Sequence, residues 1–238
     1  MDWVLCLDNR LIVSLDFATA AAAAQLVRQL GAPATFYKVG LQLLTAAGPS
    51  IVRELVDGGK RVFLDLKLLE IPSSVAAAVT AAGQVGASMV TVHASGGSAV
   101  LRSAVEAARR FPRLKVLALT VITSMDDEDL REVGVGSTVA EQVLRLARLA
   151  AAAGCHGVVA SPLEARLLRE TLPPEMLIVT PGIQLAGDLA KSDHARFTTA
   201  AQAIDAGATH VVVGRPIAHA PNPADALAAM RAELSALR

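Results

Sequence analysis

An acid and a base stand two positions apart at the end of an apolar run. In the stretch "VFLDLKLLEIPSS" (residues 62–74), Asp65 and Lys67 follow a segment that is typical of a buried strand. Residues two apart on a strand project to the same face, so both side chains are predicted to point inward together. Such a pair can donate and accept protons in a reaction, or it can form a charged plug that closes a barrel mouth. The spacing alone leaves both interpretations open.

Glu70 adds a second acid three residues after Lys67. Pro72 is expected to force a non-helical start to the next segment, in which Ser73 or Ser74 would cap a helix. Glu70 is therefore predicted to lie on a loop.

Eight short apolar segments alternate with Ala-rich segments whose apolar residues have helical spacing. The predicted strands are 11–16, 35–40, 61–67, 88–93, 115–121, 157–161, 177–180 and 210–214. The clearest predicted helices are 18–30, 73–85, 97–110, 138–153 and 223–237. This alternation indicates an α/β protein with a parallel sheet, and eight such units favour a single-domain (β/α)₈ TIM barrel over residues 1–238. A doubly wound open sheet uses similar local patterns and remains the alternative.

Residues capable of chemistry gather where the predicted strands end. Active sites of (β/α)₈ barrels form at that end of the strands. In chain order these residues are Asp16, Lys38, Asp65, Lys67, His93, Ser124, "TPG" (180–182) and "GRP" (214–216). Any one of them is as easily explained as a salt bridge or a loop anchor, but together they predict an active site.

Composition excludes several other classes of function. Charges interrupt every apolar run before about 18 residues accumulate, so no membrane span is predicted. The N-terminus does not resemble a signal peptide, which indicates a cytoplasmic protein. Lys+Arg and Asp+Glu both number 22, so no overall field favours nucleic acid or an anionic membrane. Cys6 and Cys155 lack the spacing of a disulfide framework or a zinc site, and are expected to be reduced and buried.

Seven motifs in order resemble those of bacterial orotidine 5′-phosphate decarboxylases. They are "LIVSLDFA", "YKVG", "FLDLKLLEIPSS", "TVHASGG", "LTVITSM", "VTPGI" and "VVVGRPI", and they span residues 11 to about 225. The resemblance implies a homodimer with shared active sites that decarboxylates orotidine 5′-phosphate to UMP in de novo pyrimidine biosynthesis. It also implies that no metal or organic cofactor takes part.

The resemblance also implies a role for each matching residue. Lys38, Asp65, Lys67 and Glu70 would form a catalytic network of alternating charge, with Glu70 reaching the neighbouring subunit's site. The substrate-binding residues would be Asp16 at the ribose, Ser124 at the pyrimidine, and Arg215 beside Gly214 at the phosphate. Pro181 and Gly182 would introduce a loop, residues 183 to about 195, that closes over the phosphate.

Several positions depart from the family pattern. The family usually has Asp at position 70, Asn and Thr at Ser73 and Ser74, and Gln at His194. Glu70 keeps the charge on a longer arm, and a misplacement of about 1 Å can lower a rate about 100-fold. His194 would donate a hydrogen bond to phosphate in a pH-dependent manner, or be a solvated loop residue. His93 is interpreted as structural or interface-forming.

Two other functions fit the same motifs. A magnesium-dependent hexulose-phosphate synthase would use the same Asp65 and Lys67 on a sugar phosphate, and metal dependence would identify it. A binding barrel that has lost catalysis through the changes at Glu70, Ser73 and Ser74 would bind UMP without turnover.

Overall fold

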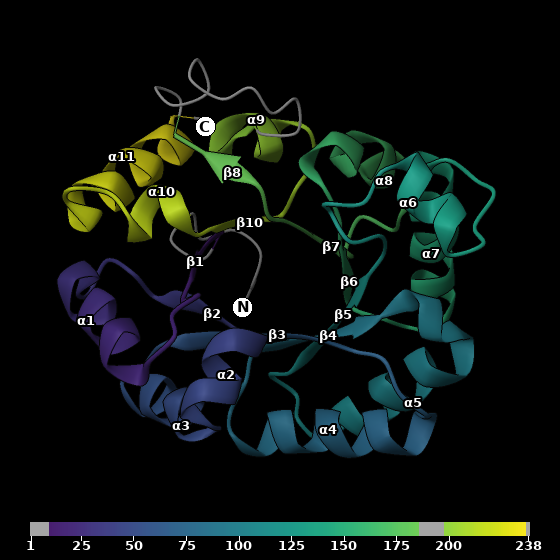
Figure 1. The fold of residues 1–238 in the computed structure, drawn as a ribbon, viewed down its shortest axis with the longest axis horizontal. Coiled ribbons are helices and arrows are strands. Elements are labelled where there is room, and N and C mark those ends of the chain that lie inside the picture. Colours follow the sequence, from purple (N-terminus) through teal and green to yellow (C-terminus); the bar gives the residue numbers. More distant parts are fainter. Residues whose placement is uncertain (1–9, 186–197, 237–238) are drawn as a thin grey trace.

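The chain folds into a closed barrel of parallel strands with helices outside it (Figure 1). The computed structural model describes residues 10–185 and 198–236. Around the barrel the strands follow the order β1-β10-β7-β6-β5-β4-β3-β2, and β1 pairs with both β2 and β10. This closure confirms the (β/α)₈ prediction and excludes the open sheet. The barrel strands are β1 (Leu11–Ser14), β2 (Phe36–Gly40), β3 (Arg61–Leu68), β4 (Met89–His93), β5 (Lys115–Leu119), β6 (Gly157–Val159), β7 (Leu177–Thr180) and β10 (His210–Val213).

Helices pack around the outside of the barrel; most of them connect successive strands, and the last two follow the last strand (Figure 1). The helices are α1 (Ala20–Leu30), α2 (Leu41–Ala47), α3 (Ser50–Asp57), α4 (Pro72–Gln84), α5 (Gly97–Ala108), α6 (Asp127–Glu132), α7 (Val139–Ala152), α8 (Ala165–Thr171), α9 (Ala200–Asp205), α10 (Arg215–Ala218) and α11 (Pro223–Ser235). Two short 3₁₀ turns, η2 (Ala94–Gly96) and η3 (Pro162–Glu164), follow β4 and β6. In the part of the chain that the structure describes, none of these helices has the length and apolar character needed to cross a membrane.

Several helices begin at side chains that satisfy their free backbone N–H groups. Thr138 accepts a hydrogen bond from Glu141 N, while the Glu141 carboxylate accepts one from Thr138 N, which is a capping box at the start of α7.

The start of α4 differs from the prediction. Pro72 is its first residue, after Ile71, and no side chain caps it, so the predicted caps at Ser73 and Ser74 are wrong. Proline is favoured there because it has no N–H to satisfy and its φ already suits a helix.

The core has two layers, one inside the barrel and one between the barrel and the helices. Side chains alternate along each strand, so neighbouring residues enter different layers. The inner layer consists of Ile12, Phe36, Phe63, Met89, Leu117, Leu119, Val159, Val179 and Val212. These side chains fill the barrel interior, so an open pocket can form only at a mouth of the barrel.

Four of the eight barrel strands, β1, β5, β6 and β10, end one or two residues before the predicted boundary, and β2, β4 and β7 end at it. β1 ends at Ser14 and β5 at Leu119, whereas the predictions extended to residues 16 and 121. Regular pairing stops there, and the chain turns away toward the next helix. The residues just beyond, Asp16 among them, therefore lie on the loops that form the mouth of the barrel.

Candidate active site

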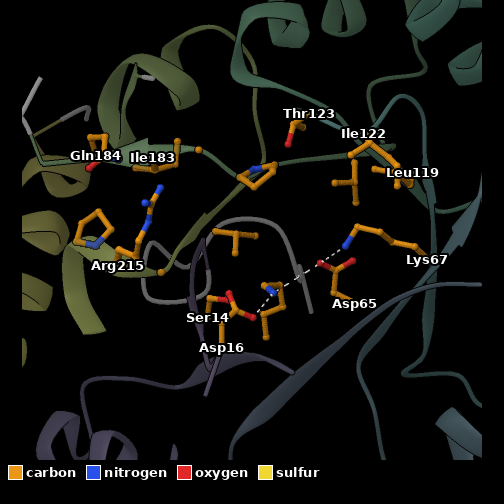
Figure 2. A pocket seen from close by; sticks show the side chains of 17 residues that line it. Ser14, Asp16, Asp65, Lys67, Leu119, Ile122, Thr123, Ile183, Gln184 and Arg215 are labelled. Carbon is orange, nitrogen blue, oxygen red and sulfur yellow. Dashed lines mark hydrogen bonds and ion pairs between the residues drawn. The ribbon is translucent and has the colours of Figure 1, made fainter. Parts of the chain in front are cut away.

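A pocket of about 270 Å³ opens at the carboxyl ends of the barrel strands (Figure 2). It contains most of the residues predicted from the sequence: Asp16, Lys38, Asp65, Lys67, Pro181, Gly182, Gly214 and Arg215. The remaining lining residues are Ser14, Leu119, Ile122, Thr123, Val159, Ile183, Gln184, Val212 and Pro216. The structure thus brings together side chains from both ends of the chain.

Four charged side chains of alternating sign form a continuous chain along one wall of the pocket. Lys38 Nζ lies 3.0 Å from Asp16 Oδ1 and 3.7 Å from Asp65 Oδ2. Lys67 Nζ lies 2.8 Å from the same Asp65 oxygen. The side chains of Lys38 and Asp65 are each 12% exposed, and that of Lys67 is 35% exposed. The Lys67 ammonium is therefore the more accessible of the two cations to a bound ligand.

The backbone that carries Lys67 is irregular. Between Leu64 and Leu68, β3 advances four residues while β4 advances two, from Val90 to Val92, which is a bulge. Lys67 has a φ of 50°, which is uncommon for any residue other than glycine. The predicted pairing of Asp65 and Lys67 is present, but simple alternation along a regular strand is not its cause. The bulge turns the lysine toward the pocket.

Asp16 is held by partners on two strands. Ser14 Oγ donates a hydrogen bond of 2.6 Å to Asp16 Oδ2, and Lys38 Nζ donates one of 3.0 Å to Oδ1. Burial favours a higher pKa for the Asp16 carboxyl, but the Lys38 charge and these hydrogen bonds outweigh it and leave the pKa below its usual value. The carboxylate is therefore ionised at neutral pH. A Cβ at Gly40 would lie 3.2 Å from both Asp16 Oδ1 and Lys38 Nζ, so glycine leaves room for this pair.

Arg215 lies across the pocket from Lys67 in Figure 2. It is the first residue of α10 and follows Gly214 directly. Its side chain is exposed, and no carboxylate in the described ranges 10–185 and 198–236 forms an ion pair with it. The guanidinium can therefore bind an anionic group of a ligand, and a loop ion pair, the alternative explanation for this arginine, is not formed with any described residue.

Three predicted site residues lie elsewhere. Glu70 is exposed on the loop before α4, as expected, and its carboxylate accepts a hydrogen bond from Ile71 N rather than lining this pocket. Ser124 is exposed on a turn, and its neighbour Thr123 lines the pocket instead. His194 lies outside the described residues. Among the described residues on either side of it, β8 (Ile183–Gln184) pairs with β9 (Thr198–Thr199).

The sequence did not single out several residues of the site. Ser14 is two positions before Asp16, and this spacing could have identified it as a partner of the carboxylate. Thr91 Oγ1 donates a hydrogen bond of 3.0 Å to Asp65 Oδ1 across 26 residues of sequence. Thr123 and Gln184 line the pocket from loops. Only the folded arrangement identifies these last three residues.

His93 stands at the end of β4 but does not line the pocket. Its Nδ1 lies 2.6 Å from Ser95 Oγ and accepts a hydrogen bond from Ser95 N, so it begins η2. Burial, together with the nearby Lys67 charge, lowers the pKa of the His93 ring. The ring is therefore neutral at pH 7, and its contacts with Ser95 fit the structural role, one of the two that were predicted for it.

A larger cavity, of about 520 Å³, lies at the opposite end of the barrel strands. Strand starts form much of its wall, including Arg61, Met89, Lys115, Leu177 and His210. Burial, followed by the charges of Arg61 and Arg10, lowers the pKa of His210 to about 3, so its ring is neutral. The smaller pocket is the stronger candidate because it holds the charged chain and lies where barrel enzymes carry out chemistry.

Comparison with known proteins gives consistent matches over nearly the whole chain. The family model described as "Orotidine 5′-phosphate decarboxylase / HUMPS family" matches residues 9–230. A relative from Moorella thermoacetica, named orotidine 5′-phosphate decarboxylase, is 45% identical over 237 residues, which cover 97% of this chain and 94% of the relative. One of the same name from Idiomarina loihiensis is 46% identical, with 92% and 95% covered. The crystal structure of orotidine 5′-phosphate decarboxylase from Lactobacillus acidophilus matches with a TM-score of 0.85 and 35% identity, over 94% of this chain and 98% of that one.

Proposed function

The chain belongs to the orotidine 5′-phosphate decarboxylase / HUMPS family, and we propose that it decarboxylates orotidine 5′-phosphate to UMP in pyrimidine biosynthesis. One observation carries the proposal: the charged chain of Asp16, Lys38, Asp65 and Lys67 faces Arg215 across a single pocket. Such a pocket suits a ligand with a reacting carboxylate at one end and a phosphate at the other. A cytoplasmic location and the absence of a nucleic-acid partner remain predictions from composition.

Lys67 is the proposed acid of the reaction. Loss of CO₂ from C6 of the pyrimidine leaves an electron pair on that carbon, which must be stabilised and then protonated. An ammonium group does both, because its positive charge opposes the developing negative charge and its proton can move to carbon. The Lys67 ammonium suits this role because it is partly exposed to the pocket and is held 2.8 Å from Asp65.

Asp65 is proposed to face the substrate carboxylate. Two like charges about 4 Å apart repel by about 4 kcal/mol at an effective dielectric constant of about 20. Enzymes lower barriers by about 8–23 kcal/mol, so this repulsion is too small to account for catalysis alone. Stabilisation of the transition state by Lys67 and Lys38 is proposed to contribute more. The hydrogen bonds that Lys67 donates to Asp65 and Lys38 donates to Asp16 support that view, because they hold both ammonium groups in place.

The remaining pocket residues are proposed to bind the substrate away from C6. Asp16, ionised and fixed by Ser14 and Lys38, would accept hydrogen bonds from the ribose hydroxyls. Arg215 would bind the phosphate with two parallel N–H groups, and Gly214 would allow close approach of the backbone. We retain the remaining substrate-binding proposals on the basis of the resemblance: Ser124 at the pyrimidine, and Pro181, Gly182 and His194 around the phosphate.

A homodimer with shared sites is part of the proposal. Glu70 does not line the pocket of its own chain, and its neighbours Leu69 and Ile71 are each 59% exposed. Large apolar side chains on both sides of an exposed acid suit an interface between two copies of the chain, related by a two-fold axis. Glu70 of one subunit would then complete the charged chain of the other.

Turnover of orotidine 5′-phosphate in excess EDTA is the direct test of this function. His, Cys, Asp and Glu side chains in the described residues do not gather in groups of three or more that could hold a metal ion. We therefore expect the absorbance of the substrate to fall at the same rate with and without the chelator. Turnover of orotidine 5′-phosphate that returns only when Mg²⁺ is added would refute the metal-independent reaction. Mg²⁺-dependent activity on a sugar phosphate, with none on orotidine 5′-phosphate, would favour the hexulose-phosphate synthase alternative. UMP binding without any turnover would favour a binding barrel.

Replacement of Arg215 by alanine should separate phosphate binding from nucleoside binding. We expect UMP affinity to fall about 10- to 100-fold, as for loss of a charge-assisted contact, while uridine affinity changes less than about 3-fold. Calorimetric titration of both ligands measures the difference. Arg53→Ala, which removes an exposed arginine on α3, serves as the control and should leave both affinities unchanged. Equal losses for UMP and uridine in the Arg215 variant would refute the phosphate assignment.

A further inference from the structure

The hydroxyl of Thr91 connects the two central residues of the charged chain. Thr91 lies in β4 and is fully buried. Its Oγ1 accepts a hydrogen bond of 2.8 Å from the backbone N–H of Lys67 and donates one of 3.0 Å to Asp65 Oδ1. Neither direction can be reversed, because an amide nitrogen only donates and an ionised carboxylate only accepts. The single hydroxyl proton is therefore committed to Asp65.

These contacts close a ring that begins and ends at Lys67. The Lys67 N–H bonds to Thr91, Thr91 bonds to one oxygen of Asp65, and the other oxygen of Asp65 accepts from Lys67 Nζ at 2.8 Å. The ring therefore fixes both the backbone and the ammonium group of the lysine. The two oxygens of the Asp65 carboxylate therefore have different partners, because Oδ1 accepts from Thr91 whereas Oδ2 contacts Lys67 and Lys38.

The bulge in β3 explains why such a contact is needed. Lys67 lies between the last regular pairs of β3 with β4, at Leu64 and Leu68, and its φ is 50°. The left-handed backbone conformation is unfavourable for lysine and persists only where surrounding contacts enforce it. Its N–H, displaced from the regular ladder of the sheet, would be left unsatisfied without a side-chain acceptor. Thr91 supplies that acceptor from the adjacent strand.

We propose that Thr91 is a positioning residue of the reaction, which sets the direction of the Lys67 ammonium and the plane of the Asp65 carboxylate. Thr91 does not line the pocket, so it acts through these two residues and not on the substrate. This inference rests on the proposed function, because Lys67 must be the group that protonates C6. Without Thr91, the bulge would relax and the ammonium would move away from the position where the charge develops.

The test compares variants at position 91 with a matched variant elsewhere. Thr91→Val keeps the shape of the side chain and removes both hydrogen bonds. A misplacement of about 1 Å can cost about 100-fold, so we expect kcat to fall about 10- to 100-fold while UMP affinity changes less than about 3-fold. Thr91→Ser retains the hydroxyl and should recover most of the loss. Thr120→Val is the control, because Thr120 is equally buried but donates to the Val159 carbonyl and does not line the pocket.

A second readout does not depend on turnover. A pyrimidine nucleotide with an anionic oxygen at C6 resembles the charge distribution of the transition state and should depend on the placement of Lys67. Thr91→Val should lower the affinity for this ligand by about the same factor as it lowers kcat, and should lower the affinity for UMP much less. A variant that merely destabilised the protein would lose affinity for both ligands to the same extent. If Thr91→Val does not fold, Thr91→Cys carries the test, because a thiol is of similar size but a poor hydrogen-bonding group.

The outcomes distinguish this inference from the proposed function. Wild-type protein without turnover refutes the function itself. Active wild-type protein with a folded Thr91→Val variant of unchanged kcat overturns the role of Thr91 and leaves the function intact. Equal impairment of the Val and Ser variants, or equal loss in Thr120→Val, also overturns it, because the hydroxyl of Thr91 would then not be the cause.

Discussion

Lys67→Ala is expected to lower kcat at least about 1000-fold while UMP binding remains measurable. The variant loses the proposed acid, and general acids contribute about 100- to 10,000-fold to rates. It also loses the charge that stabilises the transition state, and removal of one such group costs about 100- to 1000-fold. UMP carries no carboxylate at C6, and its phosphate would bind at Arg215, across the pocket from Lys67. Single-turnover kinetics and calorimetric titration with UMP measure the two quantities separately.

A matched lysine at the other end of the barrel provides the control. Lys115 is the first residue of β5 and lines the opposite cavity. Lys115→Ala should therefore leave kcat within about 2-fold of wild type, because that ammonium is a barrel length from the pocket. A second variant, Lys67→Arg, keeps the positive charge but has no readily lost proton, so it should stay severely impaired. Near wild-type kcat in Lys67→Ala would remove Lys67 from the mechanism.

Mixtures of Lys67→Ala and Glu70→Ala subunits are expected to regain about a quarter of wild-type activity, although each variant alone is severely impaired. In a two-fold dimer with shared sites, a hybrid has one site that carries both changes and one that carries neither. Random assembly of equal amounts makes about half of the dimers hybrid, each with one intact site of two. The exposed position of Glu70, outside the pocket of its own chain, motivates this expectation. Activity after co-refolding, with hybrids quantified by differential tags, gives the measurement.

A control mixture uses two changes within one site. Asp65 and Lys67 of the same chain are in contact at 2.8 Å, so they belong to the same site. In a hybrid of one Lys67→Ala subunit and one Asp65→Ala subunit, each site therefore carries one of the two substitutions. That mixture should remain as inactive as its parents. If the Lys67 and Glu70 mixture also remains inactive despite confirmed hybrids, Glu70 acts within its own chain or not at all, and the shared site is excluded.

The order of strands and helices could be predicted from the sequence because their signals are local. A strand or helix shows its period within about ten residues, and eight repeats of the pattern led to the closed barrel that the structure confirms. Barrel geometry then places the ends of all parallel strands at one mouth. Asp16, Lys38, Asp65 and Lys67 could be predicted to meet for this reason, although they span 52 positions of sequence and come from three different strand ends.

The details of the site depend on contacts between segments, which local patterns do not encode. The left-handed φ of Lys67 follows from the register between β3 and β4, and Thr91 bonds to Lys67 and Asp65 across 24 and 26 residues of sequence. The sequence pattern correctly paired Asp65 with Lys67 but assumed a regular strand. Loop conformation likewise decided that Thr123 lines the pocket and that Glu70 does not. Strand periodicity selects the face of a residue, whereas pairing register and tertiary hydrogen bonds fix where its charged atoms lie.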